Sequence, residues 1–196
     1  MIWEEAKQHA DKLLKLIEPG CLRAEIVGGV KRHDKPECHD IEILVIANEK
    51  TPRPEFGQKV IHRTMLDKVM YEICQAGTLR FLEGKDRLRK YAILDVRTIE
   101  PFKLELYIVK PETWGIQNVI RTGPSLFSHR FVTNKKRTVF HDGEQYPGLL
   151  PDEYTYIRGE TKIMRGAETL SLPEEGDALG LLGLGWIAPN ARRFVK

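Results

Sequence analysis

An apolar, β-branched segment that begins with two carboxylates, DIEILVIA at 40–47, constrains the fold more than any other part of the sequence. A run of this kind is typical of a largely buried strand. Side chains alternate across a strand, so Asp40 and Glu42 are expected to point to the same face. Two neighbouring carboxylates repel each other unless a cation or a proton offsets their charge. The segment therefore predicts a buried strand with a charged site at its first residues.

A third carboxylate, Glu105, lies between two leucines in a second strand-like segment. If Leu104 and Leu106 face the hydrophobic core, the alternation of a strand turns Glu105 to the opposite face. Two adjacent strands would then present Asp40, Glu42 and Glu105 together. Hard divalent ions such as Mg²⁺ take oxygen ligands of this kind, so the pattern predicts a site for a pair of metal ions. The alternative is that Asp40 is a turn residue and that the two glutamates form the polar side of an ordinary sheet.

Gly28 and Gly29 follow a predicted strand at 23–27. Two basic residues, Lys31 and Arg32, come shortly after them. Backbone amides without a Cβ atom nearby let a triphosphate approach closely, and the cations would balance its charge. An ordinary glycine turn is the alternative for this segment.

The pattern of apolar residues predicts an α+β protein with two domains. Apolar positions at helical spacing predict helices, and β-branched or alternating runs predict strands. Helices are expected at 2–18, at 57–76 and after Pro124, and strands at 23–27, 40–47, 88–97 and 102–109. The later sequence changes to a hairpin at 137–146, a strand at 153–158 and a short helix within 173–184. We therefore expect one domain over residues 1–136 and a smaller α+β domain over residues 137–196.

Charge and cysteine content bound the class of protein. The net charge is only +3, from 31 Lys and Arg against 28 Asp and Glu, but the basic residues bunch. Such bunches can neutralise nucleic-acid phosphates, although a solvated charged face is the usual interpretation of any one bunch. The three cysteines have unrelated spacings, which fits a reducing compartment. Because the N-terminal segment lacks the long apolar stretch of a signal peptide or membrane span, we expect a soluble, intracellular monomer that does not bind membranes. The bunched residues are Lys85, Arg87, Arg89 and Lys90, and Lys135, Lys136 and Arg137.

In chain order the sequence offers a strand, a glycine pair, a basic pair, D-x-E on a strand and a distant single Glu on another strand. This arrangement resembles the nucleotidyltransferase superfamily of DNA polymerase β, in which Gly-Ser or Gly-Gly precedes D-x-D/E and a third acid. The segment from Arg121 to Ser125 is similar to the Thr-Gly motif of the family X DNA polymerases. The C-terminal segment is similar to the closing segment of that family. Its matching residues are Leu182, Gly183, Leu184, Trp186, Pro189 and Arg192.

The resemblance implies a minimal member of family X: a polymerase-β-like palm, with a mixed sheet and helices on one face, followed by a small α+β thumb. It implies a metal-dependent DNA polymerase that adds dNMP from a dNTP to a 3′-hydroxyl of primed or gapped DNA, as in gap filling or repair. Asp40 and Glu42 would bind two Mg²⁺ ions, or Mn²⁺, and Glu105 would bind only the catalytic ion. The residues expected to bind the nucleotide are Gly28, Gly29, Arg32, Thr122, Gly123 and Ser125. The residues expected to bind nucleic acid are Lys85, Arg87, Lys103, Arg130, Lys135 and Lys136.

The sequence departs from family X at several positions. Glu42 and Glu105 stand where the family usually has Asp, and Gly29 stands where it has Ser. Longer acids favour Mn²⁺ or a weaker activity, because Mg²⁺ demands near-ideal octahedral geometry. D-x-E also occurs in some antibiotic nucleotidyltransferases, so transfer of a nucleotide to a small-molecule hydroxyl is an alternative function. A nucleic-acid-binding relative without catalytic activity is a further alternative.

Two other features have less specific interpretations. Trp114 and Trp186 are expected to pack within the protein rather than to stack on bases. His33, Cys38 and His39 surround the Asp40 motif, but a closed zinc site wants four ligands. We therefore do not expect zinc there.

Overall fold

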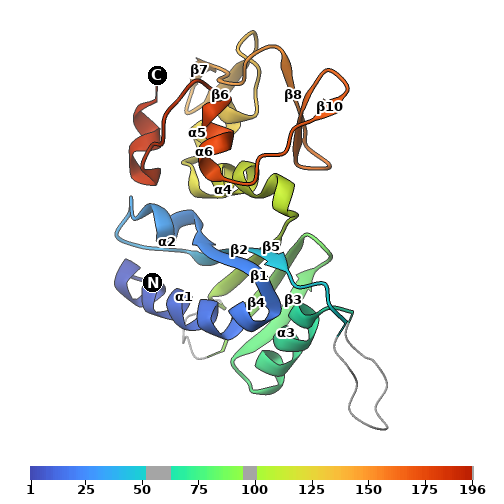
Figure 1. Cartoon of the computed structure of the whole chain (residues 1–196). Coiled ribbons are helices and arrows are strands. Elements are labelled where there is room, and N and C mark those ends of the chain that lie inside the picture. The colour runs from blue at the N-terminus through green and yellow to red at the C-terminus, as the bar shows by residue number, and fades with distance from the viewer. Residues whose placement is uncertain (52–62, 95–100, 196) are drawn as a thin grey trace. The chain divides into compact units, whose positions relative to one another are not determined.

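The computed structural model describes residues 1–51, 63–94 and 101–195. The chain divides into two compact units, Met1–Val109 and Lys110–Lys196. Each unit contains both helices and strands (Figure 1), so the α+β class expected from the sequence is confirmed. Within the described residues, no helix combines the length and the apolar character needed to cross a membrane.

The first unit is built on a mixed sheet of five strands in the order β1-β2-β5-β4-β3. The β2 and β5 strands pair in parallel, and the other neighbours pair antiparallel. A parallel pair needs a crossover connection, and here the chain between β2 and β5 includes the helix α3 (Met65–Gln75) and the β3-β4 hairpin. The strands are β1 (Cys21–Val27), β2 (Asp40–Ala47), β3 (Leu79–Gly84), β4 (Leu88–Ile93) and β5 (Lys103–Ile108).

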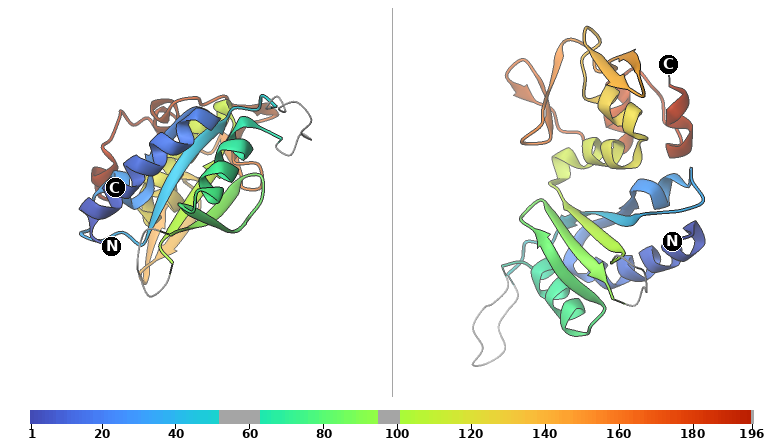
Figure 2. Two further views of the ribbon diagram at one scale, coloured as in Figure 1. Left: turned by 90° about the horizontal axis from the view of Figure 1, so that it is seen from below. Right: turned by 180° about the vertical axis from the view of Figure 1, so that it is seen from behind.

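Two helices, α1 (Trp3–Ile17) and α3 (Met65–Gln75), cover one face of this sheet (Figures 1 and 2). We call it the helix face. A capping box begins α3: the Thr64 hydroxyl accepts a hydrogen bond from the Asp67 backbone N–H, and the Asp67 carboxylate accepts one from the Thr64 N–H. These bonds satisfy backbone donors that a helix start leaves open. The shorter helical pieces of this unit are η1 (Glu18–Gly20) and α2 (Gly28–Arg32).

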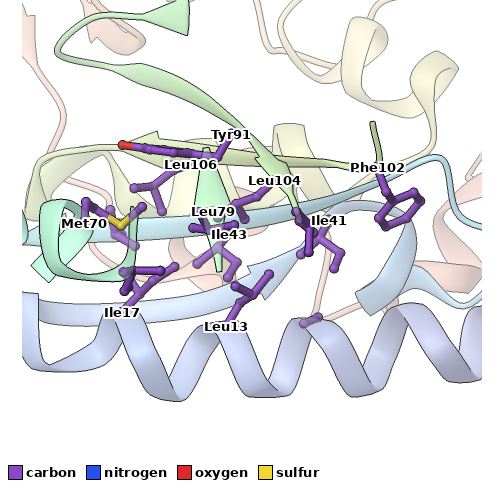
Figure 3. Packing of buried hydrophobic residues seen from close by; sticks show 14 of the residues in the cluster. Leu13, Ile17, Ile41, Ile43, Met70, Leu79, Tyr91, Phe102, Leu104 and Leu106 are labelled. Atoms are coloured by element: carbon purple, nitrogen blue, oxygen red, sulfur yellow. The ribbon is translucent and has the colours of Figure 1, made fainter. Parts of the chain in front are cut away.

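The core of the first unit lies between the helix face and the two helices (Figure 3). Leu13 and Ile17 of α1 point toward the sheet, and Leu104 and Leu106 of β5 belong to the same buried cluster. Burial of each such side chain contributes about 1.5–3 kcal/mol. The expected orientation of the two leucines is confirmed. Alternation along β5 therefore places Glu105 on the opposite face.

The second unit has its own core, formed by residues of three helices, of one strand and of two connecting segments. Because α4 and α5 bury Ile116, Val119, Phe127 and Phe131 there, both helices belong to this unit. The units accordingly divide after Val109, upstream of the expected boundary at 136/137. The elements are η2 (Pro111–Thr113), α4 (Trp114–Thr122), α5 (Ser125–Phe131), β6 (Thr138–His141), β7 (Glu144–Pro147), β8 (Tyr154–Ile157), β9 (Lys162–Arg165), β10 (Glu168–Thr169), α6 (Glu175–Gly180) and η3 (Pro189–Phe194).

Several predicted elements lie close to their expected bounds. The β2 strand covers the predicted 40–47. The helix expected at 57–76 is observed as α3 from Met65, while its predicted start at 57–62 lies outside the described residues, as do residues 95–97 of the strand expected at 88–97. The β3 strand was not expected, because Phe81 and Leu82 are adjacent and break the alternation of apolar and polar residues, and every residue after Leu79 is exposed.

Candidate active site

Strand register places Glu42 and Glu105 side by side. The β2 and β5 strands are parallel, and these two glutamates are partners across the pair. Asp40 is the partner of Lys103, two residues earlier in both strands. Residues two apart in a strand share a face. The three predicted carboxylates therefore lie at the beginning of two adjacent strands, on the face opposite to α1 and α3, which we call the carboxylate face.

The glycine pair lies beside these carboxylates. The β1 strand ends at Val27, the partner of Glu42, and Gly28 follows with a φ of 67°. A Cβ atom at Gly28 would lie 1.7 Å from Oε2 of Glu42, so the carboxylate occupies the space that a side chain would need. The left-handed backbone also favours glycine. D-x-E and the glycine turn are thus in contact within the first unit.

Asp40 lies in surroundings that oppose its negative charge. Its pKa is raised above the ordinary value by burial and, next, by the charge of Glu105. His39, Lys103 and Arg32 act in the opposite direction without cancelling the shift. The ionised form of Asp40 is therefore destabilised, and a bound cation would relieve this cost.

Two neighbouring side chains hold Glu105. Its Oε2 atom accepts a hydrogen bond from the Tyr107 hydroxyl. Its Oε1 atom lies 3.7 Å from Nζ of Lys90, the partner of Glu105 across β4 and β5. Sequence reasoning placed Lys90 only in a basic bunch, since the pattern of one strand does not reveal the residue opposite it. Lys90 and Tyr107 are therefore additions to the candidate site.

The donor chemistry of the carboxylate face fits a hard divalent cation, because all three acids offer oxygen ligands and two of them repel each other. Among the described residues, no group of three or more His, Cys, Asp or Glu side chains is gathered as metal ligands. That search covers His33, Cys38 and His39 as well as the three acids. Glu105 is directed instead toward Tyr107 and Lys90. The acids thus have the chemistry for metal binding, but their side chains are not closed around an ion.

The basic pair after the glycines is engaged with acidic partners. Nε of Arg32 lies 2.9 Å from Oδ1 of Asp34, and Lys31 is bonded to Glu25. The α2 helix that carries this pair is fixed to the N-terminal helix. Trp3 donates a hydrogen bond to the backbone carbonyl of Val30, and its ring stacks on His33 with 3.6 Å between centroids. We did not expect this role for Trp3 from the sequence.

The predicted Thr-Gly residues lie at the junction of α4 and α5, in the second unit. The buried Thr122 hydroxyl donates to Oδ1 of Asn118 at 3.2 Å. Gly123 is buried too, and a Cβ atom there would lie 2.8 Å from Oγ of Ser128. Ser125, the first residue of α5, is exposed. Of these three predicted nucleotide-binding residues, Ser125 alone has an exposed side chain.

Five of the six predicted nucleic-acid-binding residues are exposed: Lys85, Arg87, Lys103, Lys135 and Lys136. Arg130 differs, since it is only 5 % exposed. Its Nε donates to the Pro147 carbonyl at 2.8 Å, and its Nη1 donates to the Val195 carbonyl at 2.7 Å. This arrangement counts against a phosphate contact by Arg130, because its guanidinium serves the fold of the second unit.

The two tryptophans singled out in the sequence have opposite environments. Trp114 is fully buried, as expected, but Trp186 is 68 % exposed, so the expectation that Trp186 packs inside is wrong. The side chain of Arg192 holds the chain that follows Trp186. Buried to 1 % exposure, it donates to the Ile187 carbonyl at 3.2 Å and to Oε1 of Glu175 at 2.8 Å. This guanidinium fixes the closing segment immediately after Trp186.

No protein-family model matches this chain, and no curated protein matches it. The three carboxylates, the glycine pair and the basic pair all lie in the first unit. We infer the function from these residues.

Proposed function

We propose that this chain is a metal-dependent nucleotidyltransferase of the polymerase β type, which adds dNMP from a dNTP to a 3′-hydroxyl of primed or gapped DNA. One observation carries the proposal: the register of β2 and β5 makes Glu42 and Glu105 partners, while Gly28 contacts the Glu42 carboxylate. Three acids and a glycine turn, separated in sequence, thereby meet at one end of one sheet. The order of these motifs along the chain supports the same function.

The residues of the carboxylate face have distinct roles in this proposal. Asp40 and Glu42 would hold both ions, and Glu105 would hold only the ion beside the attacking hydroxyl. When bound, two such ions supply activation of the attacking oxygen and stabilisation of the leaving pyrophosphate. The raised pKa of Asp40 fits its role, because a cation would offset the cost of its charge.

The phosphates of the nucleotide would lie against the glycine turn. The space beside Gly28 holds the Glu42 carboxylate, but a Cβ atom at Gly29 would come no closer than 3.9 Å to another side chain, so a phosphate oxygen can approach the backbone closely at Gly29. Arg32 would exchange its contact with Asp34 for the triphosphate. This exchange keeps the guanidinium paired with an anion in both states.

The exposed basic residues of the first unit favour a polyanionic acceptor. Lys85 and Arg87 lie between β3 and β4, and Lys103 begins β5 two residues before Glu105. Contacts of this kind release counterions from DNA, so the affinity for gapped DNA should fall steeply as salt rises. Transfer to a cationic antibiotic would require an acidic surface around the acceptor instead.

The proposal is tested with a one-nucleotide gapped duplex, labelled dNTP and either Mg²⁺ or Mn²⁺. We expect extension by one nucleotide that requires the divalent ion and is lost in Asp40→Asn. A parallel reaction with an aminoglycoside and labelled ATP separates the alternative acceptor. No extension with either ion, or full extension by Asp40→Asn, would contradict the proposal.

A further inference from the structure

The third acid lies in a row of charges that crosses four strands. Glu83 of β3 is the partner of Lys90 in β4, Lys90 is the partner of Glu105 in β5, and Glu105 is the partner of Glu42 in β2. The signs along the row are negative, positive, negative and negative. One ammonium group therefore lies between the exposed acid of β3 and the acids of the candidate site.

Distances show how this ammonium is shared. Nζ of Lys90 lies 2.9 Å from Oε1 of Glu83 and 3.7 Å from Oε1 of Glu105. The Lys90 side chain is 30 % exposed and that of Glu105 is 18 % exposed, so solvent screens this pair only in part. Tyr107 donates to the other oxygen of Glu105. Both carboxylate oxygens of Glu105 are thus engaged by side chains of this chain.

We propose that the Lys90 ammonium acts as a built-in cation that neutralises Glu105 while the site holds no divalent ion, and that it weakens metal binding by competing for that carboxylate. The inference rests on the proposed function. Lys90 is a positioning residue here, because it acts through Glu105 and not on the nucleotide.

The physical reason is that Glu105 has one set of oxygen atoms for two kinds of cation. Without a divalent ion, Lys90 offsets the repulsion that Glu105 exerts on Asp40, a repulsion seen in the raised pKa of Asp40. A divalent ion bound by the same acids would repel the ammonium. Lys90 would then leave Glu105 and keep its closer contact with Glu83.

The test is the affinity for Mn²⁺ alone, measured by the electron paramagnetic resonance signal of free Mn²⁺ without DNA or nucleotide. Lys90→Met should bind Mn²⁺ about fivefold more tightly, the factor that corresponds to losing the competing attraction between two unit charges, those of Lys90 and Glu105, at about 4 Å in a water-like dielectric. Lys90→Arg keeps the charge and should stay close to the parent. The matched control is Lys68→Met, because Lys68 also lies 3.7 Å from a glutamate, Glu72, but on α3. It should leave the affinity unchanged.

Two further variants separate competition for Glu105 from a general effect of charge. In a Glu105→Gln background there is no carboxylate to compete for, so the gain from Lys90→Met should shrink. In thermal unfolding without divalent ions, Lys90→Met should melt below the parent, and added Mn²⁺ should raise its melting temperature by more than that of the parent. The inference is overturned if Lys90→Met binds Mn²⁺ no more tightly than the parent, or if the gain is undiminished in Glu105→Gln.

Failure of this inference and failure of the proposed function give different results. If Asp40→Asn abolishes Mn²⁺ binding while Lys90→Met does not tighten it, only the role of Lys90 is wrong. If Asp40→Asn binds Mn²⁺ like the parent, the ions bind elsewhere and the proposed metal site is wrong. A parent protein that binds no Mn²⁺ would overturn both.

Discussion

The two faces of the five-stranded sheet are built in opposite ways. The helix face is apolar, and the two charged residues beside it form an ion pair. Oδ1 of Asp67 in α3 lies 2.7 Å from Nη1 of Arg89 in β4. The carboxylate face brings Asp40, Glu42 and Glu105 together without closing them around a cation. One face stabilises the fold, whereas the other accepts unfavourable electrostatics. Such a local departure from the rules of stability is expected at a functional site.

Two aspartates make this contrast measurable. Burial opposes the ionisation of Asp67, but the hydrogen bond and charge of Arg89 outweigh it and lower the pKa of Asp67. Burial also opposes the ionisation of Asp40, and there the charge of Glu105 adds to it and raises the pKa. An ionised aspartate therefore stabilises the fold at position 67 and destabilises it at position 40.

The largest effect that separates the two faces should be the loss of nucleotide transfer when Glu105 is substituted. Glu105→Gln removes a charge that the proposed reaction needs chiefly in its transition state, so nucleotide transfer should fall about a thousandfold. Metal-dependent binding of dNTP should stay near that of the parent, because Asp40 and Glu42 are intact. Single-turnover gap filling and dNTP titration measure the two quantities. A parental rate in Glu105→Gln would mean that the third acid is misassigned, and Asp95, which lies outside the described residues, would be tested next.

Substitution of Leu104, the residue before Glu105 on β5, should lower stability and leave the rate of transfer unchanged. Leu104→Ala empties a fully buried position on the helix face, and the free energy of unfolding should fall by about 2–5 kcal/mol. The rate of transfer per folded molecule should change little, because Leu104 faces the core. Urea unfolding followed by circular dichroism gives the stability. A loss below about 1 kcal/mol, or a rate that drops as far as in Glu105→Gln, would contradict the division into two faces.

A smaller effect is expected at the ion pair beside the helix face. Asp67→Asn keeps the shape of the side chain but removes its charge, so stability at neutral pH should fall by at most about 1 kcal/mol, the upper end for an ion pair that solvent partly screens. The folded pKa of Asp67 is lowered, so its contribution is present above the unfolded pKa near 4 and is lost as pH falls through the lower, folded value. The stability difference between parent and Asp67→Asn should therefore vanish in acid. A difference that is constant from pH 7 to pH 2 would show that charge is not its source.

Much of the first unit could be predicted because its patterns are local. The β-branched run at 40–47 determines its own strand, and the leucines on either side of Glu105 determine which way that acid points. The glycine turn after β1 is marked by composition alone. These signals place the three acids on one face before any pairing of strands is known.

The remaining features depend on contacts between distant segments. The partner of Glu105 in β4 follows from strand register, which the alternation of a single strand does not determine, so the role of Lys90 was not predicted. Arg130 lies at the basic end of a helix, yet its guanidinium is buried and donates hydrogen bonds to the carbonyls of Pro147 and Val195. Trp186 is exposed, and the carbonyl of the next residue, Ile187, accepts a hydrogen bond from the buried Arg192. In each case the sequence shows the residue type but not its partner.

Whether the carboxylate face is kept for catalysis is decided best by measuring stability and gap filling on one preparation of Asp40→Asn. The folded pKa of Asp40 is raised, so its ionised form costs stability above the unfolded pKa, and this cost disappears as pH falls and the carboxylate is protonated. Without divalent ions at pH 7, Asp40→Asn should therefore unfold at a higher urea concentration than the parent, and the gain should shrink in acid. The same variant should fail to fill a one-nucleotide gap with Mg²⁺ or Mn²⁺. A variant that is less stable than the parent at pH 7, or that fills the gap at the parental rate, would contradict this interpretation.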